Sequence, residues 1–363
     1  MIDGPSAASQ TGGYKQARKV GVKDIARTLG LSIGTVDRAL HNRGEINPLT
    51  RQRVLAMAET LGYKPNLAAR YLKSKRKLSL SINLPVGTST FYDAIRKGIR
   101  DAAGPLDMAV QLEFRTHSRL GEGDAKLIDD AIAEGANGII LAPGNPQALR
   151  PLIRRAAQRK IPVVCVATDA PGTERLTTVS ADPYISGAMA AELLSRICPQ
   201  GRSAAVVTGF WETMDHAEKL RGFKESLSCS GGSLQFAEVV ETHDDPREAQ
   251  VRTQELLEKH PGLDAMYVST GNSISVLQAI EKAGRMGSMA IVTTDLFPEL
   301  GLRIRKGAVF ATLYQRPFSQ GRLAFQALYR FLMEGKCPPG RIKLLPHVVM
   351  RSNLDLILEK LRE

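Results

Sequence analysis

Apolar positions near the start of the chain recur with the period of an α-helix. A first short helix has its apolar residues on one face: Val22, Ile25, Ala26 and Leu29. Gly30 ends that helix, and Ser32 is placed to cap a second one. The second helix has its own inner face, made by Thr35, Val36, Ala39 and Leu40. The spacing therefore predicts a helix-turn-helix.

A third helix is needed because two short helices bury little surface by themselves. Asn47 as N-cap, Pro48 at the first helical position and Gly62 at the end bracket it. Its predicted inner face holds four residues: Val54, Met57, Ala58 and Leu61. The segment GYKPNLAARYLKSKRK follows, in which Pro65 prevents a continuous helix and Asn66 can cap a fourth, short and very basic helix.

From Leu78 onward, short β-rich runs alternate with helical stretches. The strand-like runs are LSLSINLP, GIILAP, IPVVCVA, SAAVVTG, AMYVST and MAIVTT. Helical periods separate them, for example FYDAIRKGIRDAA and PQALRPLIRRAAQRK. This order predicts repeated βαβ units and parallel sheet. Two doubly wound lobes suit the length, and a closed barrel of βα units is open by count alone.

Composition sets the class of protein. With 363 residues and 43% hydrophobic content, a small head and a core large enough to divide in two are expected. Residues 1–19 are rich in Ser, Gly and Gln without an apolar run, which predicts a disordered leader and no signal peptide. No run approaches the ~18 apolar residues of a membrane span, so we expect a soluble cytoplasmic protein.

The cysteines point to no metal site. Cys165, Cys198, Cys229 and Cys337 stand far apart, with neither a CxxC pair nor a nearby His. We expect reduced thiols, no metal and no cofactor.

Charge is concentrated in the head. Residues 1–77 hold 15 Lys and Arg against 5 Asp and Glu, a balance of +10, whereas the remainder holds 34 against 32, a balance of +2. A plain three-helix core would explain the apolar positions without any nucleic acid. The concentrated positive charge favours a partner rich in phosphates, namely DNA.

These residues resemble the DNA-binding head of the lac repressor (LacI/GalR) family. The order helix-turn-helix, GYKPN and a short basic helix containing a Leu carries the likeness, which runs from Val20 to the end of the chain. The resemblance implies a second helix in the major groove and a hinge helix in the minor groove. The DNA-binding residues that it implies by position are Ser32, Ile33, Gly34, Thr35, Arg38, Thr50, Asn66 and Leu72.

The roles within that set differ. Ile33, Gly34 and Arg38 occupy the base-reading positions, although Gly34 has no side chain to read a base, and Arg38 has phosphate contact as its alternative. Ser32, Thr35 and Thr50 would meet phosphates. Leu72 would be the wedge that kinks the duplex, with packing between paired hinge helices as the alternative. Asp37 departs from the family's usual small hydroxyl residue and would repel phosphate unless it pairs.

For the rest of the chain, the resemblance implies a periplasmic sugar-binding-protein-like core. The predicted fold class is therefore α/β, with an all-α helix-turn-helix head and a two-lobed, doubly wound core. The predicted divisions are 20–65 for the DNA-binding domain, 66–77 for the hinge, 78–354 for the core and 355–363 for a C-terminal tail. Lobe one is expected at 78–180 and 311–341, and lobe two at 181–310 and 342–354. Without an added tetramer helix, a homodimer is expected.

Effector-site candidates follow from strand ends and family positions. Asp169 and Asp295 each end a strand, and their carboxylates suit sugar hydroxyls, although an Asp there also serves as a turn or cap residue. Lys219 stands where the family commonly has Arg, which changes the expected contacts. The other candidates are Phe91, Tyr92 and Trp211 for ring stacking, together with His216, Asn272 and Gln315.

The leading hypothesis is a dimeric, sequence-specific transcriptional repressor whose operator affinity is controlled by a sugar-like effector bound between the lobes. One alternative is an enzyme with an accessory DNA-binding head. The chain has no GxGxxG after a strand, no GxxxxGK[ST], no HExxH and no GxSxG, all of which speaks against that alternative. The other is a simple sugar-binding module, which the +10 head and the missing export signal oppose.

Overall fold

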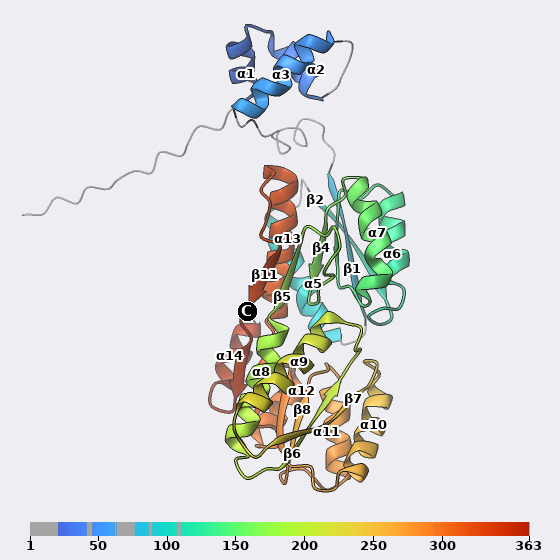
Figure 1. Cartoon of the computed structure of the whole chain (residues 1–363), viewed down its shortest axis with the longest axis vertical. Helices are drawn as coiled ribbons and strands as arrows, with labels where there is room; N and C mark the ends of the chain where they lie inside the picture. The colour runs from blue at the N-terminus through green and yellow to red at the C-terminus, as the bar shows by residue number, and fades with distance from the viewer. Residues whose placement is uncertain are drawn as a thin grey trace, which may run out of the picture. The chain divides into compact units, whose positions relative to one another are not determined.

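The computed structural model of the chain describes residues 21–41, 46–61, 63, 77–86, 89–106 and 110–362. The chain divides into two compact units, Met1–Leu67 and Ala68–Glu363. Their helices and strands are labelled in Figure 1. In these described ranges, every helix is too short or too polar to cross a membrane.

The first unit is a three-helix domain. Its helices are α1 (Val22–Leu29), α2 (Ile33–His41) and α3 (Pro48–Thr60). They share one small core, made by Ile25, Ala26, Val36, Ala39, Val54 and Ala58. The predicted helix-turn-helix and its covering third helix are thereby confirmed. Met57 and Leu61 are partly buried at the edge of that core.

Local signals fix the ends of these helices. Gly30 adopts a left-handed backbone (φ 66°) after α1, which glycine tolerates without strain. Ser32 Oγ accepts a hydrogen bond from Thr35 N at 3.1 Å at the start of α2. Asn47 Oδ1 accepts one from Leu49 N at 2.9 Å, with Pro48 at the first position of α3. Each signal was readable in the sequence because it acts within four residues.

The second unit contains two open six-stranded sheets, so the closed barrel is excluded. The first has the order β11-β5-β4-β3-β1-β2, with β1 Leu78–Pro85, β2 Val110–His117, β3 Gly138–Leu141, β4 Val163–Val166, β5 Thr177–Ala181 and β11 Arg341–Leu344. The second has the order β12-β10-β9-β8-β6-β7, with β6 Ser203–Thr208, β7 Gln235–Glu241, β8 Ala265–Val268, β9 Ala290–Thr294, β10 Ala311–Tyr314 and β12 His347–Met350. Neighbouring strands pair in parallel, except β10 with β12.

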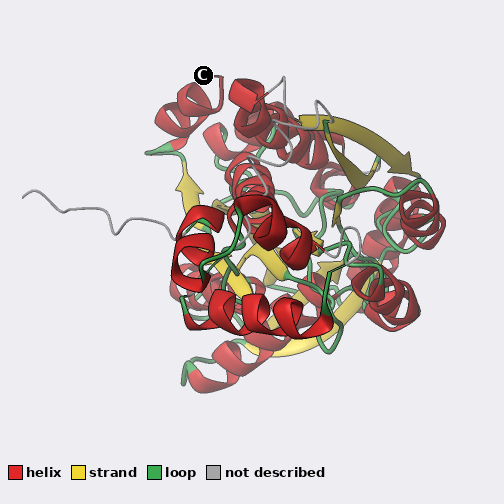
Figure 2. Cartoon of the chain, turned by 90° about the horizontal axis from the view of Figure 1, so that it is seen from above, coloured by secondary structure: helices red, strands yellow, loops and turns green. Residues whose placement is uncertain are grey.

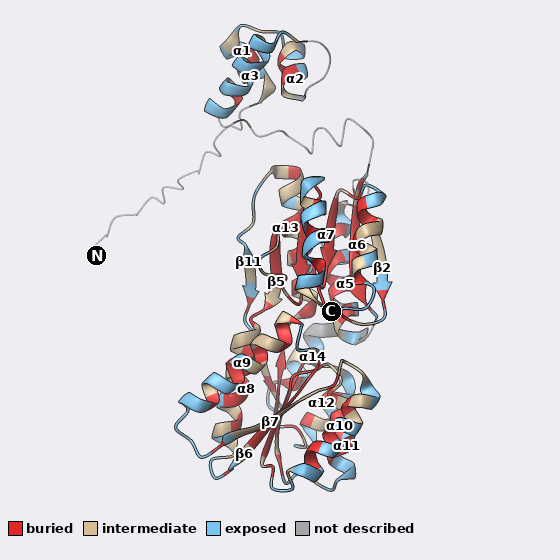
Figure 3. Cartoon of the chain, turned by 45° about the vertical axis from the view of Figure 1, so that its right-hand side comes forward, coloured by how far each residue is buried: buried red, intermediate tan, exposed pale blue. Residues whose placement is uncertain are grey.

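Helices cover both faces of each sheet (Figure 1, Figure 2). Lobe one has α5 (Ser89–Ala103), α6 (Asp124–Ala133), α7 (Pro146–Gln158), α13 (Pro317–Glu334) and the 3-10 turn η1 (Gly104–Leu106). Lobe two has α8 (Pro183–Ile197), α9 (Met214–Cys229), α10 (Pro246–Lys259), α11 (Ser273–Lys282), α12 (Pro298–Arg305) and α14 (Leu354–Arg362). The central strands β3 and β4, which are covered on both faces, bury every residue, and Figure 3 colours such strand interiors as buried.

The chain passes between the lobes after β5, after β10 and after β11. The sequence placed the second and third crossings at 310/311 and 341/342, which is a few residues too early. Residues 311–314 still form β10, paired with β9 in lobe two, and residues 341–344 form β11, paired with β5 in lobe one. A short apolar run suits either sheet, so its partner strand, rather than its own pattern, decides where it belongs.

The predicted C-terminal tail is also structured. Residues from Leu354 onward form α14, and Leu354 is fully buried in the core of lobe two. Ile357 and Leu358 pack against the same core. The apolar spacing of these residues is helical, so the signal was present in the sequence.

Glycines let two helix pairs approach closely, one pair in each lobe. In lobe two, a Cβ on Gly187 of α8 would lie 1.9 Å from the backbone oxygen of Lys219 on α9. In lobe one, a Cβ on Gly98 of α5 would lie 2.0 Å from the backbone oxygen of Phe318 on α13. Real Cβ atoms do not come so near, so these contacts require glycine. They hold α9 and α5, which both border the interlobe cleft, against their neighbours.

We predict that Gly187→Ala lowers the free energy of unfolding by about 1–3 kcal/mol, because the added methyl group forces α8 and α9 apart. Alanine is otherwise preferred in a helix interior, so a loss reports the steric contact. Thermal and urea unfolding measure the effect. Gly262→Ala is the matched control, since nothing lies within 4 Å of its Cβ position. Equal stability of Gly187→Ala and wild type would disprove the close packing.

Candidate functional site

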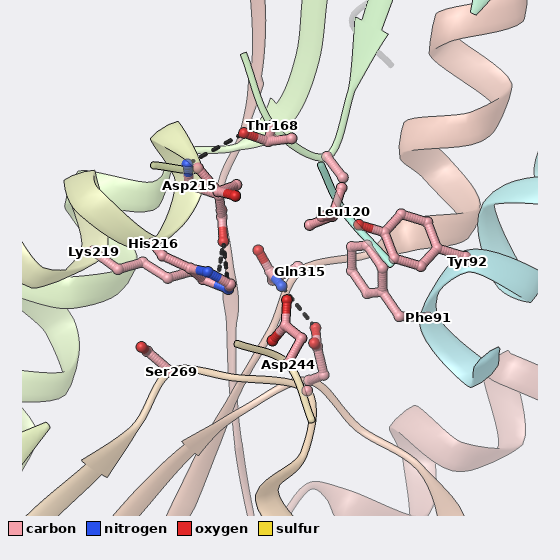
Figure 4. A pocket seen from close by; sticks show the side chains of 14 residues that line it. Phe91, Tyr92, Leu120, Thr168, Asp215, His216, Lys219, Asp244, Ser269 and Gln315 are labelled. Carbon is pink, nitrogen blue, oxygen red and sulfur yellow. Dashed lines mark hydrogen bonds and ion pairs between the residues drawn. The ribbon is translucent and has the colours of Figure 1, made fainter. Parts of the chain in front are cut away.

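A pocket lies between the lobes at the carboxyl ends of the parallel strands. It encloses about 440 Å³ of space not filled by atoms, including the part open to solvent. Lobe one supplies Phe91, Tyr92, Leu120, Ala167 and Thr168. Lobe two supplies Asp215, His216, Lys219, Asp244, Ser269 and Asp295, and Gln315 lies on the crossing segment. One wall is therefore largely apolar and the other is charged (Figure 4).

The first turns of α9 organise the charged wall. Lys219 is 1% exposed, and its Nζ donates a hydrogen bond to Asp215 Oδ2 at 2.6 Å. Burial lowers the pKa of Lys219, but the Asp215 carboxylate and other nearby groups more than offset it, so the pKa stays above its usual value. Lys219 is therefore a fixed ammonium group.

His216 lies beside this pair on α9. Its Nδ1 accepts a hydrogen bond from the Phe210 backbone N–H at 2.9 Å. With Nδ1 as the acceptor, Nε2 is the ring nitrogen that can donate, and it lies 4.0 Å from Asp215 Oδ2. His216 thus presents an N–H donor toward the acid.

Asp295 follows β9 and is 8% exposed. Its Oδ1 accepts a hydrogen bond from Gln315 Nε2 at 2.8 Å. Burial raises the pKa of Asp295 to about 6, even though Lys219 and Gln315 act to lower it. Asp244 follows β7, and its Oδ1 accepts from Thr270 Oγ1 at 2.9 Å. Both acids therefore have only neutral hydrogen-bond donors in these contacts.

The apolar wall comes from α5 and the loop after β2. The rings of Phe91 and Tyr92 meet edge to face, with centroids 5.2 Å apart. Leu120 lies beside them (Figure 4). Burial and then the negative charges of Asp244, Asp215 and Asp295 raise the pKa of Tyr92 well above its usual value. Its hydroxyl is thus a neutral hydrogen-bonding group next to an aromatic surface suited to a sugar ring.

Unusual backbone conformations gather at this cleft. Within the described residues, six positions other than glycine have a left-handed backbone. Five of them follow strand ends here: Ala167, His243, Asp244, Asp295 and Arg316. Such conformations are costly for most side chains and are typical of sites where side-chain placement matters. In this chain they turn Asp244 and Asp295 toward the pocket.

Direct hydrogen bonds join the two lobes around the pocket. Thr213 Oγ1 donates to Gly144 O at 3.1 Å, and the Asp215 backbone N–H donates to Thr168 Oγ1 at 3.3 Å. Nearer the surface, Asn145 Nδ2 donates to Glu212 Oε2 at 2.7 Å. The start of α9 therefore contacts lobe one, and the lobes are closed on each other.

In the head, α2 exposes one stripe of residues. Ile33 is 51% exposed, and Gly34 and Arg38 are exposed beside it, on the side opposite buried Val36 and Ala39. Such a stripe is available to a groove in DNA.

Asp37 lies at the margin of this stripe. Burial and then the charge of Asp37 raise the pKa of Tyr63, which places the carboxylate near that ring. The polar residues at the start of α2 are also engaged, since Ser32 Oγ lies 2.8 Å from Thr35 Oγ1. Thr50 is half-buried in α3.

Comparison with known families agrees with both units. Residues 21–66 match the family described as "Bacterial regulatory proteins, lacI family". Residues 81–336 match the "Periplasmic binding protein domain" family. The chain belongs to the periplasmic binding protein domain family, and its head is a lacI-family DNA-binding domain. Its named relatives are transcriptional regulators and not enzymes.

Individual relatives and solved structures resemble this chain over most of its length. Catabolite control protein A of Priestia megaterium is 28% identical over 90% of this chain and 97% of the relative. The ribose operon repressor of Bacillus subtilis strain 168 is 24% identical over 85% and 90%. Among solved structures, a glucose-galactose binding protein from Geobacillus stearothermophilus has a TM-score of 0.71 at 24% identity, covering 77% of this chain and 99% of that one. The Caulobacter myo-inositol binding protein has a TM-score of 0.71 at 20% identity, covering 77% and 95%. These two likenesses show the fold.

Six of the nine predicted effector-site residues line the pocket. They are Phe91, Tyr92, His216, Lys219, Asp295 and Gln315. Their part in binding stays a prediction.

Asp169 is the main correction. Its carboxylate accepts hydrogen bonds from Arg175 and Thr178, and Arg341 Nε lies 3.0 Å from Oδ2. Burial raises the pKa of Asp169, but these partners together hold it below its usual value. The acid does not line the pocket and instead ties the loop after β4 to β5 and β11.

Two further predicted residues lie outside the pocket. Trp211 is 50% exposed, and its backbone N–H donates to Glu241 Oε1 at 2.7 Å. Asn272 precedes α11 and borders a separate shallow hollow together with Thr90 and Phe297. Both lie near the ends of strands, but neither residue lines the pocket.

The sequence analysis missed Asp215, Asp244 and Thr168. Asp215 carried a usable signal, because an acid four residues before a Lys on one helix predicts an ion pair. Asp244 and Thr168 carried none, since many polar residues follow strands. The predicted Asn66 and Leu72, and the leader at 1–19, lie outside the described residues.

We predict that Asp169→Asn lowers the free energy of unfolding by about 3 kcal/mol while leaving effector binding intact, because Arg175 loses its buried counter-charge. A depressed pKa stabilises the fold above the ordinary Asp pKa, and this contribution is lost as pH falls through the lower folded value. The difference from wild type should therefore hold from pH 8 to about 5, begin to shrink near pH 4, and be lost only as the pH falls through the lower folded pKa. Urea unfolding across pH measures it. If Asp169→Asn instead abolished effector binding without changing stability, Asp169 would have to be assigned to the effector site.

Proposed function

We propose that the chain is a dimeric, cytoplasmic, sequence-specific repressor whose operator affinity is controlled by a sugar-like effector bound in the interlobe pocket. In this proposal residues 20–65 read DNA, residues 66–77 form the hinge, and the core from residue 78 senses the effector. The observation that carries it is the combination, in one chain, of a strongly basic helix-turn-helix head and a closed pocket with one apolar and one charged wall.

Charge and exposure support the DNA-binding part. The first 77 residues have a balance of +10, and the exposed stripe on α2 offers Ile33 and Arg38 to base edges. A helix-turn-helix dimer reads two half-sites, so a palindromic operator is expected. Ser32, Thr35 and Thr50 are proposed phosphate contacts.

The effector part is supported by the pocket and by the relatives. The names of lacI-family relatives include a ribose operon repressor and a maltose regulon regulatory protein, and the solved neighbours include glucose-galactose and myo-inositol binding proteins. An aromatic wall facing carboxylates suits a ring with one apolar face and several hydroxyl groups.

Control of DNA binding requires that the effector favours one arrangement of the lobes. A ligand that contacts both walls stabilises the closed pair, in which α9 touches lobe one. The lobes can move relative to each other at the three crossings between the sheets. In a dimer, this movement can alter the spacing of the two hinge segments. The effector then changes operator affinity by its differential affinity for the two arrangements.

The whole proposal is tested by selecting duplexes from a random library with the full chain. A recovered palindrome is then titrated by fluorescence anisotropy, with and without each member of a panel of sugars and polyols. A shift of operator affinity by one compound, and a dimer in sedimentation equilibrium, support it. The proposal is wrong if no sequence is enriched over the starting library.

We predict that Arg38→Ala weakens operator binding by about 1–3 kcal/mol and relaxes preference at one position in each half-site, because a bidentate contact to guanine is lost. Anisotropy on operator and on a scrambled duplex over a salt series measures this. The scrambled duplex is the control, and Arg38→Ala should bind it with nearly the same affinity as wild type does. An equal loss on both duplexes would instead assign Arg38 to phosphate.

We predict that Asn145→Asp favours open lobes and lowers effector affinity by about 0.5–1 kcal/mol, a two- to fivefold loss. Asn145 Oδ1 caps α7 by accepting from Gln147 N and Ala148 N, and Asp retains that acceptor. Its second oxygen replaces the amide donor and repels Glu212. Small-angle scattering should show a larger radius of gyration.

Adding Glu212→Gln to Asn145→Asp is the control. The amide introduced by the second substitution can donate to the carboxylate introduced by the first, so compactness and affinity should return toward wild type. No recovery would place the defect in α7 and not in the interlobe contact.

A further inference from the structure

The interlobe pocket contains more negative than positive charge. Three carboxylates line it, from Asp215, Asp244 and Asp295, against the single ammonium group of Lys219. His216 adds an imidazole ring to the same wall. Two arginines lie near but do not line the pocket: Arg96 pairs with Asp93 at 2.8 Å, and Arg316 precedes α13.

Lys219 is not available to an anionic ligand. Its Nζ is bound to Asp215 Oδ2 at 2.6 Å, one turn away on the same helix. A phosphate or carboxylate placed there would meet the Asp215 carboxylate at the same point. Asp215 Oδ1 is buried and has no hydrogen-bond partner among the described residues, so the pair still offers an acceptor.

Asp244 and Asp295 lack cationic partners in the contacts that hold them. Asp295 Oδ1 is bound by the Gln315 amide at 2.8 Å, and Asp244 Oδ1 by the Thr270 hydroxyl at 2.9 Å. Both are neutral donors. Asp169 shows the contrast within the same chain, since two guanidinium groups compensate that buried acid.

The negative charges of the three acids influence the opposite wall of the pocket. After burial, the charges of Asp244, Asp215 and Asp295 raise the pKa of Tyr92, which belongs to the opposite wall (Figure 4). The space between Tyr92 and lobe two is therefore at negative potential. A positive group is stabilised there, and an anion is repelled.

We propose that the pocket takes a polyol that carries one protonated amine, such as an amino sugar or an amino cyclitol, with the amine bound between Asp244 and Asp295. The ring lies against Phe91, Tyr92 and Leu120, and its hydroxyl groups donate to Asp215. This inference rests on the proposed effector site and names its chemical class. Sugar phosphates and sugar acids are excluded by the same charges.

The first test needs no ligand. If the charges of Asp244 and Asp295 are not fully compensated, Asp244→Asn and Asp295→Asn raise the melting temperature of the full chain at pH 8. Asn keeps the oxygen that accepts from Thr270 or Gln315. The gain from Asp295→Asn shrinks at pH 5, where the wild-type carboxyl is already protonated. Lys219, Asp215, His216 and Gln315 are the charged and polar groups that face it.

Asp169→Asn is the matched control, and it lowers the melting temperature because its acid is compensated. The inference is overturned if Asp244→Asn and Asp295→Asn both lower the melting temperature at pH 8, as the control does.

The second test is isothermal titration of the full chain with matched pairs. Glucosamine is compared with glucose, galactosamine with galactose, and scyllo-inosamine with scyllo-inositol. N-acetylglucosamine, glucose 6-phosphate and glucuronate complete the panel. The amine of at least one pair binds at least tenfold tighter than its hydroxyl partner, and Asp244→Asn or Asp295→Asn removes that preference.

The outcomes separate this inference from the proposed function. Binding of a neutral sugar as tightly as its amine partner, or tighter binding of an anion, overturns the amine and leaves the effector site standing. No binding by any compound in the panel overturns the sugar-like effector and the amine with it.

Discussion

The buried ion pair between Lys219 and Asp215 connects packing, lobe contact and ligand chemistry. Lys219 sits on the turn of α9 that packs against Gly187 of α8, and its side chain is almost completely buried. Asp215 neutralises it at 2.6 Å, while the Asp215 backbone N–H donates to Thr168 across the cleft. Because a buried charge must keep its partner, the start of α9 is held in one place. The pocket wall and the contact between lobes are thus set by the same residues.

The fold divides the pocket between its two lobes. Parallel strands end at the same edge of each sheet, so residues far apart in the chain meet where the sheets face each other. Lobe one brings the aromatic ring pair of α5, and lobe two brings the acids after β7 and β9. The left-handed backbone at Asp244 and Asp295 turns these acids inward at a conformational cost. Strained backbone conformations of this kind are typical of sites where the placement of a side chain matters more than the stability of the fold.

Local signals were predictable from the sequence, and long-range partners were not. Gly30, Ser32 and Asn47 define helix ends through contacts within four residues, and the head was predicted correctly. Asp169 and Asp295 look alike, since each follows a buried strand. Only the fold distinguishes them, because Arg341 reaches Asp169 from a strand 172 positions further along the chain. The crossings after β10 and β11 were misplaced for the same reason, since strand pairing is decided between distant segments.

The excess of carboxylates in the pocket also affects how a ligand would control the arrangement of the lobes. Asp295 is buried in this closed arrangement, and the burial raises its pKa to about 6, because the pocket solvates the charged form poorly. In an empty pocket this desolvation opposes the interlobe bonds made by Thr213 and Asn145. A ligand that supplies hydroxyl donors or a positive group replaces the lost water and removes the opposition. The acids that select the ligand then also make closure depend on it, which is the differential affinity that allosteric control requires.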